Sequence, residues 1–586
     1  MPLAHRIFLL TLFFGLLVFA ARFPLAPGQL FSFDDVNLAY SIGHFDVRTS
    51  QPQPPGYPLF VLEMRMLRWL RFRRAESILL ALNLAGTTAV LVLLALCGNA
   101  IFGGWAGLWA ALLFLLNPVF WHAGLVSALR IQLAALSLAT AMACWQAWRG
   151  EARWVLWSAL VLGIGAGVRP DAGPVLFPLW AVCAWRAPVS WPQRARALAA
   201  MAGAVLLWLL PAMFASGGPL AFLKTSMDYV SDQASVSSGL FGASEHRWQN
   251  TFWRLAVWTG CGLPGTAMAA VLSWRRREGW GLGWSRAGFL ALWFLPAFAF
   301  AILVHIEDPG QALGMAVVPA LVCGHFCQRA LDILRFRISR FFGFPLLVWG
   351  LAFGWIIGAH GTDAPFLAVW IPVASLSAAL LLKIGQTKNP GYPPAWIILP
   401  LLLPGMFLNY TMFRPNMGWY YAARGRWWDG ALAGINTGLA LTSYQHIEST
   451  LAIDDHTFRE IQHLAAERPG QTEVVWEHGL ASWRKAAYYA RGIPIVVLEH
   501  RNLRAGSPAV VAVWRGATLE RHEEGAAPLT VALPAGSRIV WLLNPRTPFS
   551  RDAQQSFRLI PAGPVWYTDL PVQHGSKILG EYRLEW

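Results

Sequence analysis

Long apolar runs and short polar segments alternate along the chain as far as Met412. A run of about 17 to 25 apolar residues is long enough to cross the hydrocarbon core of a bilayer as a helix. The candidate spans are 7–23, 77–98, 101–119, 125–147, 153–168, 172–186, 196–215, 252–273, 287–304, 311–330, 343–360, 365–383 and 395–412. The pattern therefore predicts an α-helical polytopic membrane protein with about 13 spans.

After Met412 the pattern changes, because charged residues become more frequent and the apolar runs become shorter. The stretch TEVVWEHGLASWRKAAYYARGIPIVVLEH predicts a strand, a helix and a second strand. We therefore expect a membrane domain and a soluble, exported α/β domain, with a large loop after the first span. The expected bounds are 1–412 for the membrane domain, 24–76 for its first loop and 413–586 for the soluble domain.

Arginine and lysine in short loops set the orientation of a membrane protein. With the N-terminus in the cytoplasm, the basic loops fall inside and most loop acids fall outside. The basic loops are 149–153, 186–196, 275–277, 335–340 and 383–388. The first run, 6–21, also fits a cleaved signal peptide, but either interpretation leaves the next loop outside the cytoplasm. We therefore predict a cytoplasmic N-terminus and an exported C-terminal domain.

The composition supports this assignment. Hydrophobic residues make up 56% and charged residues 13% of the chain, which excludes an ordinary soluble enzyme and a disordered chain. The net charge is +15, but the arginines lie in short clusters instead of one basic face, so nucleic acid is not an expected partner. All six cysteines lie within apolar runs, and neither disulfides nor structural zinc is expected.

One basic stretch, LEMRMLRWLRFRR over 62–74, disagrees with this orientation. Its arginines recur every three residues and its apolar side chains line the other side, as in a helix that lies flat in a headgroup layer. Membrane lipids are therefore an expected partner. Two roles stay open for Arg65 and Arg68: an interfacial anchor on anionic lipid, or capture of a lipid-linked phosphate.

Two adjacent acids, Asp34 and Asp35, follow the first span. Long ordered loops on a rigid scaffold often carry function. Adjacent residues on a helix point in different directions, so one acid is expected to face a reaction while the other supports it or contacts substrate. The alternative is structural, with Asp34 as the N-cap of a helix that begins DVNLAYSIG.

Three short motifs stand out: FDDVNLAY follows the first span, QPPGYPLF lies in the same loop, and GVRPD ends a later span. These motifs resemble those of the GT-C superfamily of membrane glycosyltransferases. The likeness is greatest to bacterial relatives of the protein O-mannosyltransferases and of the aminoarabinose transferase. It covers the architecture of about residues 1 to 412, with many spans, a large first external loop and an exported C-terminal domain beyond them.

This resemblance places the family's Asp-Glu pair on Asp34 and Asp35, with Asp35 in place of Glu. The family's His-Pro-Pro-x-x-Pro element falls on 53–58, where Gln53 replaces the histidine. His44 is a candidate for the missing imidazole. The prolines predict a rigid, extended turn that holds Tyr57.

A sugar on a polyprenyl phosphate already has a good leaving group, which needs a cation more than it needs an acid. Asp34 can then act as general base on an acceptor hydroxyl, which attacks the anomeric carbon with inversion. The expected cation is Arg169, at the outer end of a span, because a planar guanidinium suits bidentate phosphate binding. Asp171 can pair with it, and simple snorkelling of Arg169 is the alternative. Arg130 is the next candidate cation.

The motif HIEDPGQ, 305–311, also falls on the outer face. Its acids could bind an acceptor or a divalent cation, although two acids with one histidine are weak evidence for a metal. We otherwise expect neither a metal nor a cofactor.

These observations predict a bacterial inner-membrane glycosyltransferase that takes a sugar from a polyprenyl-phosphate-linked donor. The acceptor, on the exported side, is a glycan, a lipid or a protein. A flippase for lipid-linked sugars is the rival from another class, but it needs charges along a path through span centres, where ionisable residues are nearly absent. A glycan ligase or polymerase would use similar groups and stays open.

Overall fold

The computed structural model describes residues 3–238, 248–260, 282–304, 306, 308–333, 438–477, 481–499 and 509–586. The predictions for 343–360, 365–383, 395–412 and the second half of 252–273 lie outside these residues, as do the basic loops 275–277, 335–340 and 383–388. The described chain forms two compact units. One comprises Met1–Gly28 and Pro54–His446, and the other comprises Gln29–Gln53 and Ile447–Trp586.

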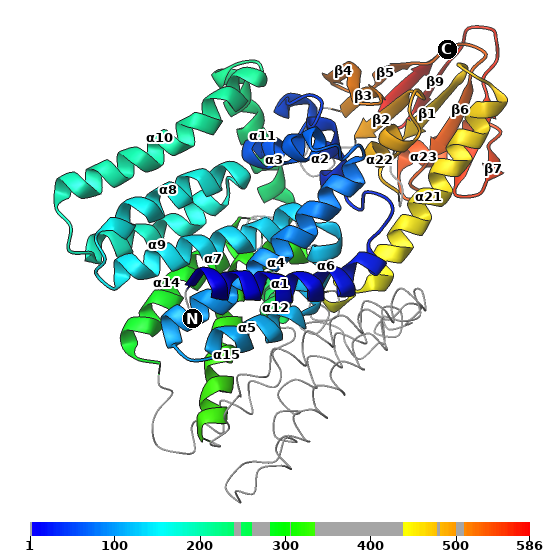
Figure 1. Cartoon of the computed structure of the whole chain (residues 1–586). Coiled ribbons are helices and arrows are strands. Elements are labelled where there is room, and N and C mark those ends of the chain that lie inside the picture. The colour runs from blue at the N-terminus through cyan, green and yellow to red at the C-terminus, as the bar shows by residue number, and fades with distance from the viewer. Residues whose placement is uncertain are drawn as a thin grey trace, which may run out of the picture. The chain divides into compact units, whose positions relative to one another are not determined.

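The first unit is helical (Figure 1). Its helices are α1 Leu3–Arg22, η1 Phe23–Leu25, α3 Pro58–Trp69, α4 Ala75–Phe102, α5 Ala106–Leu115, α6 Pro118–Val126, α7 Ala128–Trp148, α8 Arg153–Val168, α9 Ala172–Arg186, α10 Trp191–Ala215, α11 Pro219–Ser237, α12 Trp248–Gly260, α14 Trp284–Leu303, η3 Pro309–Ala312 and α15 Leu313–Ile333. Within the described ranges, 6 helices are long and apolar enough to span a membrane, or up to 7 if a bent pair counts as one. The protein is therefore a multi-pass membrane protein, while the count of about 13 spans is not confirmed.

The bent pair consists of α5 and α6, which meet at 67°. Asn117 caps α6, because its side chain accepts hydrogen bonds from the backbone N–H groups of Val119 and Phe120 at 2.8 and 3.3 Å. Pro118 occupies the first position of α6, where no N–H is needed. The expectation of one continuous span over 101–119 is therefore wrong, because the Asn-Pro pair ends one helix and starts another.

Glycine lets several helices of this unit pack closely. A Cβ at Gly163 of α8 would lie 2.8 Å from the carbonyl oxygen of Met201 and 3.0 Å from the Cβ of Ala204, both on α10. A Cβ at Gly98 of α4 would lie 2.4 Å from the Cα of Gly107 on α5. Small residues at such contacts let backbones approach where the hydrophobic effect contributes little between helices.

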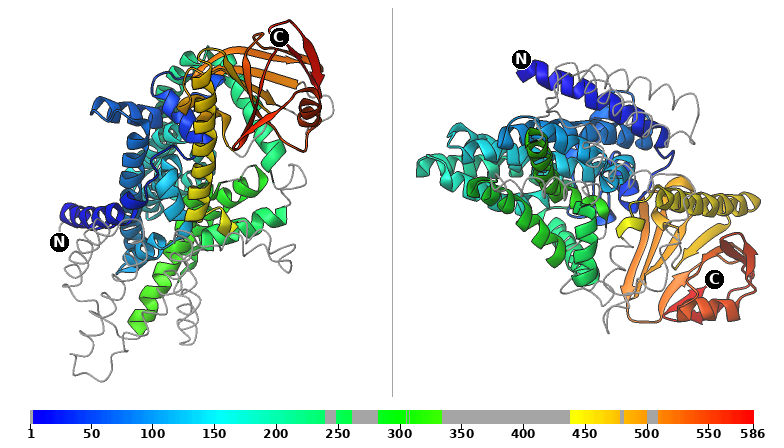
Figure 2. Two further views of the ribbon diagram at one scale, coloured as in Figure 1. Left: turned by 90° about the vertical axis from the view of Figure 1, so that its right-hand side faces the viewer. Right: turned by 90° about the horizontal axis from the view of Figure 1, so that it is seen from below.

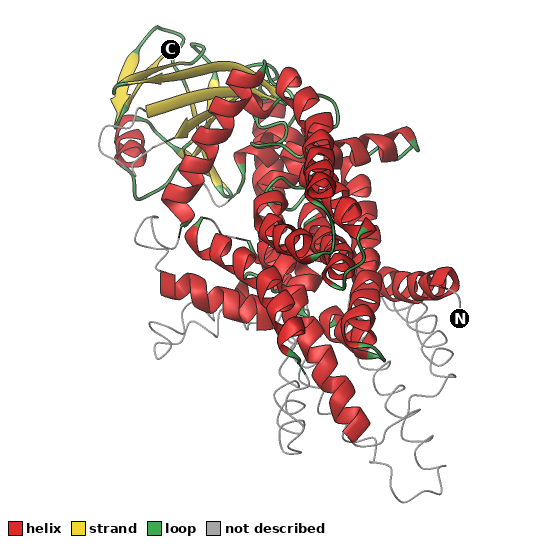
Figure 3. Ribbon diagram, turned by 90° about the vertical axis from the view of Figure 1, so that its left-hand side faces the viewer, coloured by secondary structure: helices red, strands yellow, loops and turns green. Residues whose placement is uncertain are grey.

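The second unit contains a larger and a smaller sheet, and all the described strands belong to this unit (Figure 3). Its helices are α2 Phe33–Ser41, η2 Val47–Thr49, α21 Tyr444–Glu467, which begins in the first unit, α22 Trp483–Tyr489 and α23 Pro548–Ser556. Its strands are β1 Thr472–Trp476, β2 Ile495–Glu499, β3 Ala509–Arg515, β4 Thr518–Gly525, β5 Leu529–Ala532, β6 Arg538–Leu542, β7 Ile560–Ala562, β8 Val565–Asp569, β9 Ser576–Leu579 and β10 Tyr582–Glu585.

The larger sheet has seven strands in the order β4-β3-β2-β1-β6-β8-β7, and β1 pairs in parallel with β2 and β6. The predicted strand, helix and strand are β1, α22 and β2, so this prediction is confirmed. One face of the sheet packs on α21 and α22, through residues such as Ile461 and Ala486. The other packs on α23 and the small sheet β5-β10-β9, through Phe549 and Tyr582. Figure 2 shows α21 running along the sheet.

Candidate active site

The acidic pair lies in the first turn of α2, and the local sequence explains how this helix begins. The Ser32 side chain accepts a hydrogen bond from the Asp35 backbone N–H at 3.1 Å, and Asp35 Oδ2 accepts one from the Ser32 N–H at 3.0 Å. This reciprocal arrangement is a capping box. The alternative in which Asp34 is the N-cap is therefore wrong, because Ser32 occupies that position.

The two acids have different surroundings. Asp35 is 6% exposed, whereas Asp34 is half-buried. Burial raises the pKa of Asp35 to about 7, and the charge of Asp34 adds to this rise, while the Ser32 hydrogen bonds and the charge of Lys485 oppose it. Asp35 is thus occupied in starting the helix, and Asp34 is the more accessible carboxylate. Their catalytic roles stay predictions.

The loop that follows α2 holds two further candidates. Gln53, which stands where the family motif has histidine, is buried, and its Oε1 lies 3.5 Å from Nδ2 of Asn37 on α2. This contact is at the long end for a hydrogen bond. His44 follows the end of α2 and is exposed. Gln53 therefore contacts α2, the acidic helix that carries Asp34 and Asp35. A role for His44 stays a prediction.

In the first unit, Arg169 is the C-cap of α8 and only 5% exposed. Its Nε lies 2.8 Å from Oδ1 and 3.0 Å from Oδ2 of Asp171, as the sequence led us to expect. The Tyr57 ring centroid lies 5.8 Å from its Cζ, within the range of a cation–π interaction. No described residue accepts a hydrogen bond from its Nη1. Two predicted residues, Arg169 and Tyr57, therefore lie together.

Arg130 lies on α7 and is buried. Its Cγ would lie 2.7 Å from a Cβ at Gly310, so its side chain packs against η3. Asp308 caps η3 and forms a capping box with Gln311. The end of the HIEDPGQ motif thus packs on Arg130, whereas His305 and Glu307 lie outside the described residues.

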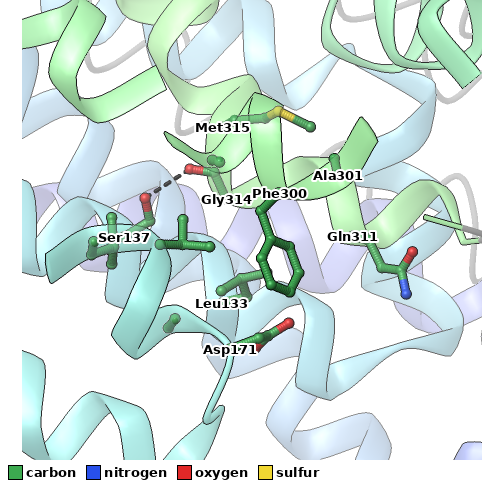
Figure 4. Close-up of a pocket in the computed structure, with 12 residues that line it drawn as sticks. Leu133, Ser137, Asp171, Phe300, Ala301, Gln311, Gly314 and Met315 are labelled. Carbon is green, nitrogen blue, oxygen red and sulfur yellow. Dashed lines mark hydrogen bonds between the residues drawn. The ribbon is translucent and has the colours of Figure 1, made fainter. Parts of the chain in front are cut away.

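A pocket with an open volume of about 540 Å³ lies between α7, α9, α14 and α15. Its wall is mostly apolar, and its polar members are Ser137, Asp171 and Gln311. Ser137 donates a hydrogen bond to the Gly314 carbonyl oxygen at 2.7 Å, as Figure 4 shows, and the Phe300 ring points toward Asp171. The acid that holds Arg169 is therefore also part of the pocket wall.

The predicted amphipathic helix is α3, with Arg65 and Arg68 exposed on its surface. Met66 and Trp69 are 58% and 84% exposed, while Met64 on the other side is buried. Exposed arginine beside exposed apolar side chains suits a helix in a headgroup layer. The two alternative roles of these arginines stay predictions.

In the part of the chain that the structure describes, no group of three or more His, Cys, Asp or Glu residues is arranged to hold a metal ion. A divalent cation at HIEDPGQ is not tested by this, because two of that motif's residues lie outside the described ranges.

Arg484 and Lys485 were not among the predicted site residues, although both contact the segment that carries the acids. Arg484 Nε donates to Asn37 Oδ1 at 2.9 Å, and Lys485 Nζ donates to the Phe31 carbonyl oxygen at 2.9 Å. Two adjacent cations in the small-residue stretch ASWRKAA were the available signal, since buried charges are rare without partners.

Solved structures share this architecture. Crystal structures of ArnT from Cupriavidus metallidurans, in the apo state and bound to undecaprenyl phosphate, match 95% of this chain with TM-scores of 0.52 and 0.51. The matches cover 96% and 97% of the ArnT chains, at 13% and 12% sequence identity. The chain is similar in fold to ArnT. No protein-family model and no curated protein matches the sequence.

ArnT is a GT-C glycosyltransferase. The resemblance to the GT-C superfamily that three short motifs indicated is therefore confirmed at the level of the fold. The ArnT likeness extends over nearly the whole chain, including the strand-rich C-terminal domain.

Proposed function

We propose that this chain is a membrane glycosyltransferase that transfers a sugar, with inversion, from a polyprenyl-phosphate donor to an acceptor on the exported side. The ArnT-like fold supports this proposal, as does the ArnT structure that holds undecaprenyl phosphate. The observation that carries it is the environment of Arg169. Its buried guanidinium forms an ion pair with Asp171, which lines an apolar pocket. No described residue accepts a hydrogen bond from its Nη1.

In this proposal, Arg169 binds the donor phosphate and stabilises the charge that develops on it as the sugar leaves. Charge-assisted hydrogen bonds from guanidinium to phosphate are strong, and they are worth more in a dry site than in water. Asp171 fixes the guanidinium through Nε, which leaves Nη1 for a ligand. The apolar pocket wall suits the first isoprene units of the donor.

Asp34 acts as the general base. It takes the proton of the acceptor hydroxyl while that oxygen forms a bond to the anomeric carbon and the bond from that carbon to the phosphate oxygen breaks. The products are the glycosylated acceptor and polyprenyl phosphate. Asp35 supports Asp34 by starting α2. A bacterial inner membrane, a cytoplasmic N-terminus and an exported C-terminal domain complete the proposal.

The test uses the full-length protein in nanodiscs with labelled polyprenyl-phosphate sugars, and it measures release of polyprenyl phosphate. Asp34→Asn is expected to lower the rate by about 10² to 10⁴, the usual contribution of a general base. Arg169→Gln is expected to weaken retention of undecaprenyl phosphate, and Arg169→Lys to restore part of it. Asp228→Asn, which changes an exposed acid on α11, is the matched control.

Equal turnover in the wild type and Asp34→Asn would contradict the proposed base. Movement of a lipid-linked sugar across the membrane of reconstituted vesicles, without release of polyprenyl phosphate, would instead support a flippase. Transfer of whole glycan chains would identify a ligase or polymerase.

A further inference from the structure

The segment Gln29–Gln53, which carries both acids, belongs to the same compact unit as the C-terminal sheet. Its helix α2 packs on α22 through two pairs of aromatic rings. The centroids of Phe33 and Trp483 lie 5.5 Å apart, and those of Tyr40 and Tyr488 lie 5.3 Å apart, both edge to face. Such pairs contribute beyond the area that they bury. The end of the segment is held too, because Gln51 Nε2 donates to the Ala517 carbonyl oxygen at 2.6 Å.

Arg484 makes most of its contacts with this segment. Its Nε donates to Asn37 Oδ1 at 2.9 Å, and its Nη2 donates to the Thr49 carbonyl oxygen at 3.0 Å. Its Cζ lies 4.7 Å from the Tyr40 ring centroid and 4.2 Å from that of Trp514 on β3. The guanidinium is fully buried. One side chain therefore joins α2, η2 and the sheet.

Lys485, the next residue, joins the segment to a different element. Its Nζ donates to the Phe31 carbonyl oxygen at 2.9 Å and forms an ion pair with Asp454 on α21. Asp454 also accepts a hydrogen bond from the Ser482 backbone N–H at 3.3 Å, which fixes the start of α22. Lys485 and Asp454 are both almost fully buried. Buried charges of this kind are stable only when all their partners are in place.

We infer that Arg484 and Lys485 are positioning residues, through which the C-terminal unit holds the acidic helix in its catalytic orientation. The inference rests on the proposed function, and it gives the exported domain a role within the reaction. A helix of nine residues, as α2 is, does not persist by itself in water. Since a misplacement of about 1 Å can cost about 10²-fold in rate, a base on such a helix needs rigid support.

The test compares Arg484→Met, Arg484→Lys, Lys485→Met and Asn37→Ala with the wild type in the full-length protein. Hydrogen exchange measures the protection of 29–53 and of β1 and β6, and steady-state kinetics measure sugar transfer. The control variants are Arg558→Met and Lys577→Met, which change exposed cations of the same unit. Asn37→Ala removes the hydrogen bond between Arg484 and Asn37 from the α2 side and leaves α22 unchanged.

We expect faster exchange in 29–53, unchanged exchange in β1 and β6, and a fall in kcat of about 10² with the donor KM unchanged. Arg484→Lys should recover part of kcat, because it keeps a cation that can reach one of the two oxygens. The effects of Arg484→Met and Asn37→Ala should be less than additive, since both variants lose the hydrogen bond between Arg484 and Asn37. The control variants should match the wild type in both measurements.

Unchanged exchange in 29–53 would overturn the inference, and so would faster exchange with wild-type kcat. A loss of protection in β1 and β6 together with 29–53 would assign these residues to the stability of the whole unit and would also overturn it. If the wild type transfers no sugar, the proposed function fails. The hydrogen-exchange result alone then decides whether Arg484 and Lys485 hold the segment 29–53 in place.

Discussion

At the scale of single residues, burial makes Asp35 a pH-sensitive part of the fold. Its carboxyl group binds a proton more tightly in the folded chain, where the pKa is about 7, than in the unfolded chain, where an aspartate has a pKa of about 3.9. Between these values the folded state holds more protons, so the free energy of unfolding falls as pH rises. Above about pH 7 this contribution is lost and the dependence levels off.

Asp35→Asn is therefore expected to flatten the decline in stability between about pH 4 and pH 7. Asparagine does not ionise, and its Oδ1 can still accept the hydrogen bond from the Ser32 N–H. The measurement is the thermal unfolding midpoint of the full-length protein at pH 5 and pH 8. Asp228→Asn serves as control and should keep the wild-type dependence. A decline as steep in Asp35→Asn as in the wild type would contradict the assigned cause.

The sequence predicted unequal roles for the two acids, because adjacent helix positions cannot face one target, and these roles stay predictions. It did not identify the helix start. Ser32 and Asp35 are spaced as a capping box requires, but with Asp34 also present, the sequence allows two start positions. Packing selects between them, since Asp35 is buried and Asp34 is not.

At the scale of helices, glycine positions decide which pairs approach closely. Gly163 of α8 faces the backbone of α10, whereas a Cβ at Gly203 of α10 would meet no heavy atom within 4 Å. The same substitution is therefore expected to have opposite effects at the two positions. Gly163→Ala should lower stability by about 1 to 3 kcal/mol through overpacking. Gly203→Ala should raise it by up to about 1 kcal/mol, because alanine favours the helix.

Thermal unfolding of the two variants in one detergent checks this prediction. Both variants replace a glycine by an alanine, so a difference between their unfolding midpoints must come from the position of the substitution. Equal midpoints would show that α8 and α10 do not meet at Gly163.

Apolar runs predicted helices well wherever a run corresponds to one helix, as for α4 and α7. They failed over 101–119, where hydropathy continues through Asn117 and Pro118 although the backbone turns. Hydropathy measures the free energy of transferring a residue into lipid and does not report helix capping. A break inside an apolar stretch is therefore found only from its cap residues.

At the scale of the whole molecule, the chain passes between its two units after Gly28, Gln53 and His446. Sequence composition predicts a separate C-terminal domain, because charge and run length alter after Met412. It does not show that 29–53 joins that domain. The segment is short, and its partners on α22 lie more than four hundred residues away, as for Asn37 and Arg484.

A fragment of residues 447–586 is therefore expected to be incomplete. A peptide of residues 29–53 added to it should raise its unfolding midpoint in a concentration-dependent way, because a ligand of the folded state stabilises it. The same peptide with Asn37→Ala should be weaker, since it loses the acceptor for Arg484. Equal midpoints with and without the wild-type peptide would contradict this division of the chain.

The separation of Asn37 from Arg484 by 447 residues also orders events during synthesis. At about 5 to 20 residues per second, a ribosome needs on the order of tens of seconds to extend the nascent chain from one to the other. Throughout that interval the acidic helix has been translated without its partner. The acidic helix therefore gains this contact only after Arg484 has been translated, and a product released before that point would carry α2 without its hydrogen bond to Arg484.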